Sequence, residues 1–200
     1  MTAAELDDAG RPRLDLDHDQ PATPAGAIGQ RTLVQVHQHL RAELGELRQA
    51  ITSVVESRSD PAAARALINR MTMRQNFWSL GAFCAAYCRV LTIHHTIEDE
   101  QMFSLLRDRD QRLAPVLDRL SHEHEVIAAV LDQVDAALAG LVAGDDSPTD
   151  SRTARPTDGS TDRLDRVSAQ IERLSDALLS HLDYEEDQLL GPIGRLSIMV

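Results

Sequence analysis

The stretch that decides the fold is CAAYCRVLTIHHTIEDEQM, residues 84–102. Its apolar residues recur every three or four positions, which is the spacing of an amphipathic α-helix that packs one face against a core. These residues are Cys84, Tyr87, Leu91 and Met102. Two polar side chains, His94 and Glu98, continue the same stripe. The stretch therefore predicts a helix that carries polar, metal-binding types of side chain into a helical core.

Three other segments of the chain show the same spacing. The four apolar stripes extend over residues 33–54, 80–105, 113–141 and 164–189. Aromatic residues make up only 3% of the chain, and the abundant Leu and Ala favour helices over a β-sandwich. Because most links between the stripes are short, the sequence predicts an all-α fold, an up-and-down antiparallel four-helix bundle.

Composition sets the expected limits of this bundle. Residues 1–27 are rich in Asp, Pro and Ala without apolar periodicity, which is typical of a disordered arm, so the bundle is expected over residues 28–195. The polar stretch at about 144–162 is expected to be a disordered loop between the third and fourth helices. The fourth helix is expected to stop at the Gly-Pro pair at 191–192. Residues 62–76 fit either a short extra helix or the beginning of the second helix.

Length and charge narrow the class of protein. A chain of 200 residues suits one domain, and a net charge of −12 argues against nucleic acid and anionic membrane surfaces as partners. No stretch reaches the roughly 20 apolar residues of a membrane span, and residues 1–10 lack the features of a signal peptide, so a cytoplasmic protein is expected. A monomer is consistent with a single acidic bundle. Cys84 and Cys88 are interpreted as reduced thiols packed in the core, with a redox or ligand role left open.

Polar residues of metal-binding types interrupt the apolar stripe of every predicted helix. At about 100° per residue, His37 continues the stripe of residues 33–54, whereas His39 points away from it. Along residues 113–141, His124 lies on the stripe and His122 lies off it. We therefore expect His37 and His124 to face the core.

The other two helices each carry a histidine with a glutamate four residues later. His94 with Glu98, and His181 with Glu185, stack on one helix face. His95 is the alternative to His94, and the residue four positions after it, Asp99, lies slightly off that face. The stripe favours His94.

All of these inward side chains are expected at a similar depth, in a slab of roughly 10 Å, because a helix rises ~1.5 Å per residue. Imidazole and carboxylate ligands suit iron or zinc, and ligands from four helices favour two ions. The candidate metal ligands are His37, His94, Glu98, His124, His181 and Glu185.

These residues resemble the hemerythrin HHE cation-binding family over roughly residues 29–193. The similarity lies in VHQHLRAEL at 36–44, IHHTIEDE at 93–100, EHEVI at 123–127 and HLDYEE at 181–186. The resemblance implies a non-haem centre of two iron ions. It also implies that Glu98 and Glu185 bridge the two ions, and that the four histidines are terminal ligands.

One position departs from the family pattern. Oxygen-carrying hemerythrins have a second histidine one turn before the ligand of the third helix, where this chain has Leu120. The resemblance then implies that one iron lacks a protein ligand, which favours reaction with O2, peroxide or nitric oxide over reversible oxygen carriage. Tyr184, one turn beyond His181, is interpreted as a packing residue within reach of the site.

The expected role is oxygen or redox sensing or a response to oxidative stress, through a protein partner that the sequence does not identify. A di-iron peroxidase-type enzyme is one alternative, and a metal-free helical interaction or regulatory bundle is another. A ferritin-like oxidase would need Glu-x-x-His on two helices, but no histidine of this chain has Glu three residues before it.

Overall fold

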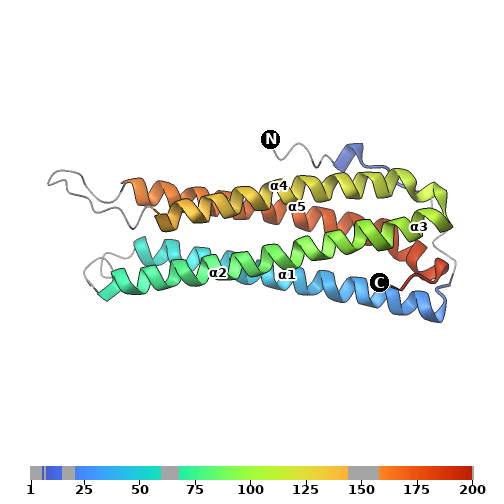
Figure 1. Ribbon diagram of the computed structural model, residues 1–200, viewed down its shortest axis with the longest axis horizontal. Coiled ribbons are helices and arrows are strands. Elements are labelled where there is room, and N and C mark those ends of the chain that lie inside the picture. The colour runs from blue at the N-terminus through green and yellow to red at the C-terminus, as the bar shows by residue number, and fades with distance from the viewer. Residues whose placement is uncertain (1–5, 7, 15–20, 60–67, 144–157, 200) are drawn as a thin grey trace. The chain divides into compact units, whose positions relative to one another are not determined.

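The computed structural model describes residues 6, 8–14, 21–59, 68–143 and 158–199. Regular structure in these ranges is helical throughout and contains no strand (Figure 1), which confirms the predicted all-α class. The long helices are α1 (Pro24–Ser59), α2 (Ile68–Ile97), α4 (Ala114–Ala143) and α5 (Asp158–Leu196). The shorter elements are the 3-10 turn η2 (Asp8–Gly10), the π-helical turn η4 (Glu98–Phe103), α3 (Ser104–Arg109) and the 3-10 turn η5 (Gln111–Leu113). None of the described helices is long and apolar enough to cross a membrane.

The chain forms two compact units, and each of the four long helices contributes to both. The first unit comprises Met1–Ala42, Val90–Ala128 and Ser175–Val200, and the second comprises Glu43–Arg89 and Ala129–Leu174. All of the candidate metal ligands belong to the first unit.

Apolar side chains from several elements fill the core of the first unit. Each such side chain, when fully buried, stabilises the fold by about 1.5–3 kcal/mol. This core cluster consists of Leu33, Met102, Phe103, Leu106, Leu113, Val116, Leu117, Leu120, Tyr184, Leu189, Ile193 and Ile198. Leu120, the residue that departs from the family pattern, is completely buried there.

In the second unit, the predicted stripes are also buried wherever side chains are described. Ile51, Val134 and Ile171 are each at most 2% exposed. Cys84 is buried and Cys88 is partly buried, and both are free thiols. Burial raises the pKa of Cys84 to about 12 and that of Cys88 to about 11, so both thiols stay protonated at neutral pH.

The π-helical turn η4 shifts the inward face of the chain by one residue. A π-helix closes its hydrogen bonds over five residues instead of four, so each such turn takes up an extra residue. Leu105, expected on the buried stripe, is therefore 37% exposed, and Leu106 is fully buried in its place. The regular spacing of the sequence did not reveal this shift.

Helix α5 differs from expectation at both ends. It begins at Asp158, inside the stretch expected to be a loop, and residues 144–157 lie outside the described part of the chain. It also continues through Pro192 to Leu196 instead of stopping at the Gly-Pro pair. Contacts with the start of α1 hold this last segment, because Gln30 Nε2 donates to the Leu190 carbonyl at 2.7 Å.

The beginning of the chain also differs from the expected arm over residues 1–27. Helix α1 starts at Pro24, where Thr23 Oγ1 accepts a hydrogen bond from the Gly26 N–H at 3.0 Å and caps the helix. Residues 8–14 pack against the first unit, with Arg11 buried at 7% exposure. The question of a short extra helix at 62–76 is settled only in part, since α2 begins at Ile68 and residues 60–67 are outside the described ranges.

Candidate metal centre

Two clusters of potential metal ligands lie side by side in the first unit. The four-residue group consists of His37, His94, Glu98 and Glu185, and the three-histidine group consists of His95, His124 and His181. Within each group, one ligand atom from every residue lies within 4.8 Å of the others. Helices α1, α2, α4 and α5 and the turn η4 all contribute to these groups.

In the four-residue group, imidazole nitrogens face carboxylate oxygens at short range. His94 Nε2 lies 3.1 Å from Glu98 Oε1, one helical turn further along the chain. His37 Nε2 lies 3.5 Å from Glu185 Oε2 and 3.8 Å from Glu98 Oε1. These donor atoms therefore converge on one point from three different helices and the π turn.

In the three-histidine group, imidazole rings pack against one another. His124 Nε2 and His181 Nε2 are 3.1 Å apart. The ring of His95 stacks on that of His124, with centroids 4.0 Å apart and planes within 8° of parallel. Three imidazoles in this arrangement offer nitrogen donors of the kind that iron, zinc and copper prefer.

Glu98 and Glu185 lie between the two groups. Glu98 directs Oε1 toward the four-residue group, while its Oε2 is 3.6 Å from His124 Nε2. Glu185 Oε2 is 3.5 Å from His37 Nε2 and 3.7 Å from His181 Nε2. Each carboxylate thus approaches imidazoles of both groups.

A second layer of carboxylates orients three of the imidazoles. The Nδ1 atom of His37 lies 2.9 Å from Glu186, that of His124 lies 3.0 Å from Asp99, and that of His181 lies 3.1 Å from Glu123. A carboxylate at Nδ1 fixes that nitrogen as the protonated donor and leaves Nε2 with its lone pair directed inward. The three carboxylates are Glu186, Asp99 and Glu123.

Burial keeps four histidines of the site neutral, namely His37, His94, His95 and His181. It lowers the pKa of His37 and of His94 to about 3, reinforced by the neighbouring imidazoles. It also lowers the pKa of His95, and it lowers that of His181 to about 4 in spite of the hydrogen bond to Glu123. Neutral imidazole is the form that binds a metal ion.

The carboxyl groups of the site respond to burial in two ways. Burial raises the pKa of Glu98 well above its ordinary range, and the charge of Glu185 adds to this effect. Burial also raises the pKa of Glu185, to about 8. Burial opposes ionisation of Glu123 as well, but hydrogen bonds from His181, Arg11 and Arg119 lower its pKa to about 2. The inner pair is therefore poised to lose protons when a cation arrives, whereas Glu123 is already charged.

Unpaired polar atoms at the centre test whether these residues fit a metal. Among the described residues, the buried atoms without a hydrogen-bond partner include seven from the two groups. These are the Nε2 atoms of His37, His94 and His95, and both carboxylate oxygens of Glu98 and of Glu185. Buried polar atoms without partners cost free energy. Cations placed among these lone pairs would satisfy all of them, so the donor set fits metal ions.

The structure brings all six predicted ligands together and adds His95. The sequence favoured His94 over His95, whereas the structure places one of the two in each group. Two adjacent residues point about 100° apart on a helix, and that spread allows one helix to reach two neighbouring positions. The His-His pair at 94–95 was the signal for this arrangement. His39 and His122, expected to point away, are exposed.

One further expectation changes. Because position 120 is Leu120 and not a histidine, one metal position was expected to lack a protein ligand. Instead, His95 lies with His124 and His181 and supplies a third imidazole to that group. Tyr184 packs in the buried core cluster, as interpreted from the sequence, and its hydroxyl donates to the Pro12 carbonyl at 2.6 Å. Arg11, which lies in the expected disordered arm, contacts Glu123 and had no signal in the sequence pattern.

Comparison with known proteins agrees with this geometry. The sequence model of one protein family, the hemerythrin HHE cation-binding domain, matches residues 28–193. This range includes every residue of both groups. The chain belongs to the hemerythrin HHE family. No curated protein and no solved structure matches the chain. Membership of this hemerythrin family and the His/Glu clusters both indicate cation binding.

Proposed function

We propose that the protein holds two iron ions in this centre and uses them to bind or react with O2, peroxide or nitric oxide, in oxygen or redox sensing or in the response to oxidative stress. The observation that carries the proposal is the set of seven buried, unpaired donor atoms in two adjacent groups. His37 and His94 would hold one ion, and the three-histidine group would hold the other. Glu98 and Glu185 would contact both.

The two positions differ in the number of nitrogen donors. The four-residue group offers two imidazoles and the three-histidine group offers three. The ion with fewer protein ligands keeps a position for a small molecule, which is the condition for reactivity at a metal. When bound, iron would supply the electrons and the coordination position for that small molecule.

The protein's own residues control protons and water around this position. His37, Glu98 and Glu185 are at most 1% exposed, so bulk water is excluded from the centre. Glu185, with its raised pKa, holds a proton at neutral pH in the metal-free site and gives it up on metal binding. Glu186 and Asp99 hold the rings of His37 and His124 in orientation throughout.

We also propose that the helices alternate in direction as an up-and-down antiparallel bundle. Contacts within the first unit support this arrangement for α1 and α5. The Thr23 N–H, at the beginning of α1, donates to the Gly194 carbonyl, near the end of α5, at 3.0 Å. His37, further along α1, meets Glu185, further back along α5. Both contacts are those of neighbouring helices that run in opposite directions.

Iron content and optical spectra test the proposed function. We expect about two irons per chain after purification from iron-supplemented cells, with absorption that changes on exposure to air, peroxide or nitric oxide. Replacing both Glu98→Gln and Glu185→Gln should abolish this absorption, because the two carboxylates that approach both groups become neutral amides. His122→Asn, at an exposed position, is the matched control and should leave iron content unchanged. An iron-free, colourless, folded wild-type protein would contradict the proposal and favour a metal-free interaction bundle.

A further inference from the structure

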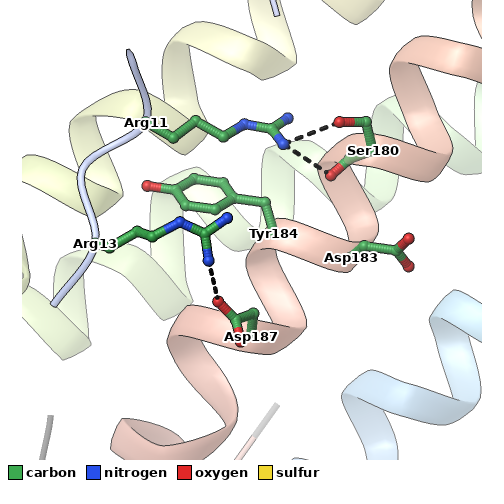
Figure 2. A pocket seen from close by; sticks show the side chains of 6 residues that line it. All are labelled: Arg11, Arg13, Ser180, Asp183, Tyr184 and Asp187. Atoms are coloured by element: carbon green, nitrogen blue, oxygen red, sulfur yellow. Dashed lines mark hydrogen bonds and ion pairs between the residues drawn. The ribbon is translucent and has the colours of Figure 1, made fainter. Parts of the chain in front are cut away.

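The N-terminal segment 8–14 packs along one face of α5 beside the three-histidine group. The Leu14 N–H donates to Gln188 Oε1 at 2.9 Å, and the Pro12 carbonyl accepts from Tyr184. Arg13 forms an ion pair with Asp187 at 3.1 Å, in which both side chains are more than half exposed. Figure 2 shows the Tyr184 ring between the side chains of Arg11 and Arg13. The segment is thus held at three successive points along the helix.

Arg11 is the part of this segment that enters the protein. Its side chain is 3% exposed, and its guanidinium lies 4.6 Å from the centroid of the Tyr184 ring. Nη1 donates to the Ser180 carbonyl at 3.2 Å and to Ser180 Oγ at 2.9 Å (Figure 2). A buried charge is tolerated only when it is paired and hydrogen-bonded. The pairing that Arg11 finds is with Glu123.

Arg11 binds the Glu123 carboxylate through two parallel hydrogen bonds. Nε donates to Oε1 at 2.8 Å and Nη2 donates to Oε2 at 2.9 Å. This fork-to-fork geometry fixes the plane of a carboxylate, which a single donor does not. Arg119, one turn before Glu123 on α4, adds a single bond to Oε1 at 2.7 Å. Only Arg11 contacts both oxygens in the described structure.

Glu123 in turn holds an imidazole of the metal centre. Its Oε2, the oxygen that accepts from Arg11 Nη2, lies 3.1 Å from His181 Nδ1. His181 directs Nε2 toward His124 Nε2 and Glu185. A continuous hydrogen-bonded chain therefore runs from Arg11 through Glu123 to His181. His37 has an analogous chain through Glu186 and Arg41, but Glu186 is 23% exposed whereas Glu123 is 0% exposed.

Arg11 also separates Glu123 from solvent. A pocket of about 370 Å³ opens beside the segment, lined by Arg11, Arg13, Ser180, Asp183, Tyr184 and Asp187. Arg11 lines this pocket, and Glu123 does not. Without the guanidinium, water from the pocket would reach Glu123 and compete with His181 for its oxygens.

We propose that Arg11 is a positioning residue for the three-histidine group. It fixes Glu123 and shields it, and so holds the His181 ring with Nδ1–H toward Glu123 and Nε2 toward the ion. The N-terminal segment thereby strengthens metal binding at one of the two positions and leaves the other unaffected. This consequence for the metal rests on the proposed function, whereas the effect on His181 does not.

The effect on His181 is measured in the metal-free protein. The variants are Arg11→Gln, which removes the charge and the fork, and Arg11→Lys, which keeps the charge without the fork. Arg13→Gln, on the same segment with an exposed ion pair, is the matched control. In wild type, ¹H and ¹⁵N NMR spectra at pH 8 should show a His181 Nδ1–H proton that exchanges slowly with solvent. Both Arg11 variants should exchange this proton faster, and Arg13→Gln should match wild type.

Cobalt titration then measures the effect on metal binding. Wild type should bind two Co²⁺, and outer carboxylate partners of metal ligands typically change affinity 10–100-fold. We expect one of the two Co²⁺ affinities to fall about 10–100-fold in Arg11→Gln, with the other unchanged and the circular dichroism of a folded protein retained. A general loss of structure would instead weaken both affinities.

The two measurements separate the possible failures. If wild type binds no Co²⁺ or iron, the proposed function is wrong, and the Nδ1–H exchange still decides whether Arg11 controls His181. If exchange in both Arg11 variants matches that in Arg13→Gln, the positioning role is wrong whatever metal binds. Equal weakening of both Co²⁺ sites, or weakening of neither, would overturn the selectivity for the three-histidine group.

Discussion

His95 connects the second helix to the three-histidine group, while its neighbour His94 belongs to the four-residue group. The two rings are 5.5 Å apart, so one turn of α2 serves both positions. Each histidine would therefore contribute to a different metal position. At the residue scale, this division makes the two positions distinguishable by single substitutions.

We expect His95→Asn to weaken the binding of one metal ion and His94→Asn to weaken the binding of the other. His95→Asn removes one of three nitrogen donors, and His94→Asn removes one of two. Each loss should reduce the affinity of that position for metal by at least about tenfold, because replacing an outer partner of a ligand already changes affinity 10–100-fold. Competition of each variant against a chelator of known affinity measures the two constants separately. His122→Asn should match wild type. If His95→Asn retained both affinities, His95 would be a packing residue and not a ligand.

The stripe rule placed six of the seven site residues because a straight helix turns its face slowly, so inward positions repeat predictably. It kept His95 only as the alternative to His94, because the rule assigns one residue per turn to the core and these two residues are adjacent on one turn. The outer carboxylates Asp99 and Glu123 were missed for a different reason. They lie beside the site ligands Glu98 and His124 in sequence, and only tertiary contacts distinguish them from surface acids.

At the scale of elements, the ends of α1 and α5 approach so closely that only glycine fits. A Cβ placed on Gly26 would lie 2.0 Å from the Gly194 carbonyl oxygen, and one on Gly29 would lie 2.1 Å from the Ile198 carbonyl oxygen. Backbone atoms on both sides leave no flexible side chain to move away. This contact, with the Thr23 and Gln30 hydrogen bonds, explains why α5 continues past Pro192.

Gly26→Ala should therefore destabilise the protein, although alanine is the better helix former. We expect a loss of about 1–3 kcal/mol in the free energy of unfolding, which is typical of overpacking. Gly45→Ala is the matched control on the same helix, because no atom lies within 4 Å of its added Cβ. It should stabilise by roughly 0.5–1 kcal/mol. Urea unfolding of both variants measures the difference, and equal stability of the two would contradict the close packing of α1 on α5.

Sequence signals located the helices well and their ends less well. Helix interiors follow from apolar periodicity, which is local, and the buried stripes of α1, α4 and α5 lie where the spacing placed them. The end of α5 depends on contacts with the start of α1, a segment far from it in the chain. A Gly-Pro pair lowers the intrinsic preference for helix, but tertiary hydrogen bonds outweigh it here. Sequence periodicity and residue preferences describe only neighbouring residues, so they do not predict contacts between distant segments.

At the scale of the whole molecule, the metal-free protein carries two opposing responses to pH. His37, His94, His95 and His181 have a pKa well below the ordinary 6.5. The unfolded chain therefore binds protons below pH 6.5 that the folded protein does not, and stability is lost as the pH falls from about 6.5 toward 4. These four histidines produce the acid side of the stability curve.

Glu98 and Glu185 produce the alkaline side. Their pKa is raised from the ordinary 4.5, to about 8 for Glu185. Above the ordinary value the folded protein keeps protons that the unfolded chain releases, so stability falls as the pH rises, and the contribution of Glu185 levels off above about 8. Four histidines outweigh two carboxyls below pH 6.5. The stability of the metal-free protein should therefore reach its maximum near pH 6.5.

Bound metal should remove the alkaline side of this curve, because Glu98 and Glu185 are then ionised in the folded protein as they are in the unfolded chain. Urea unfolding at pH 5.5, 6.5 and 8.5, with chelator and with Co²⁺, measures both curves. In chelator, Glu185→Gln should lose less stability than wild type between pH 6.5 and 8.5, since the amide has no proton to release. A metal-free wild type at least as stable at pH 8.5 as at pH 6.5 would contradict the prediction that both carboxyls keep their protons at pH 6.5. In that case their burial between the two histidine groups would not hold protons in the metal-free site.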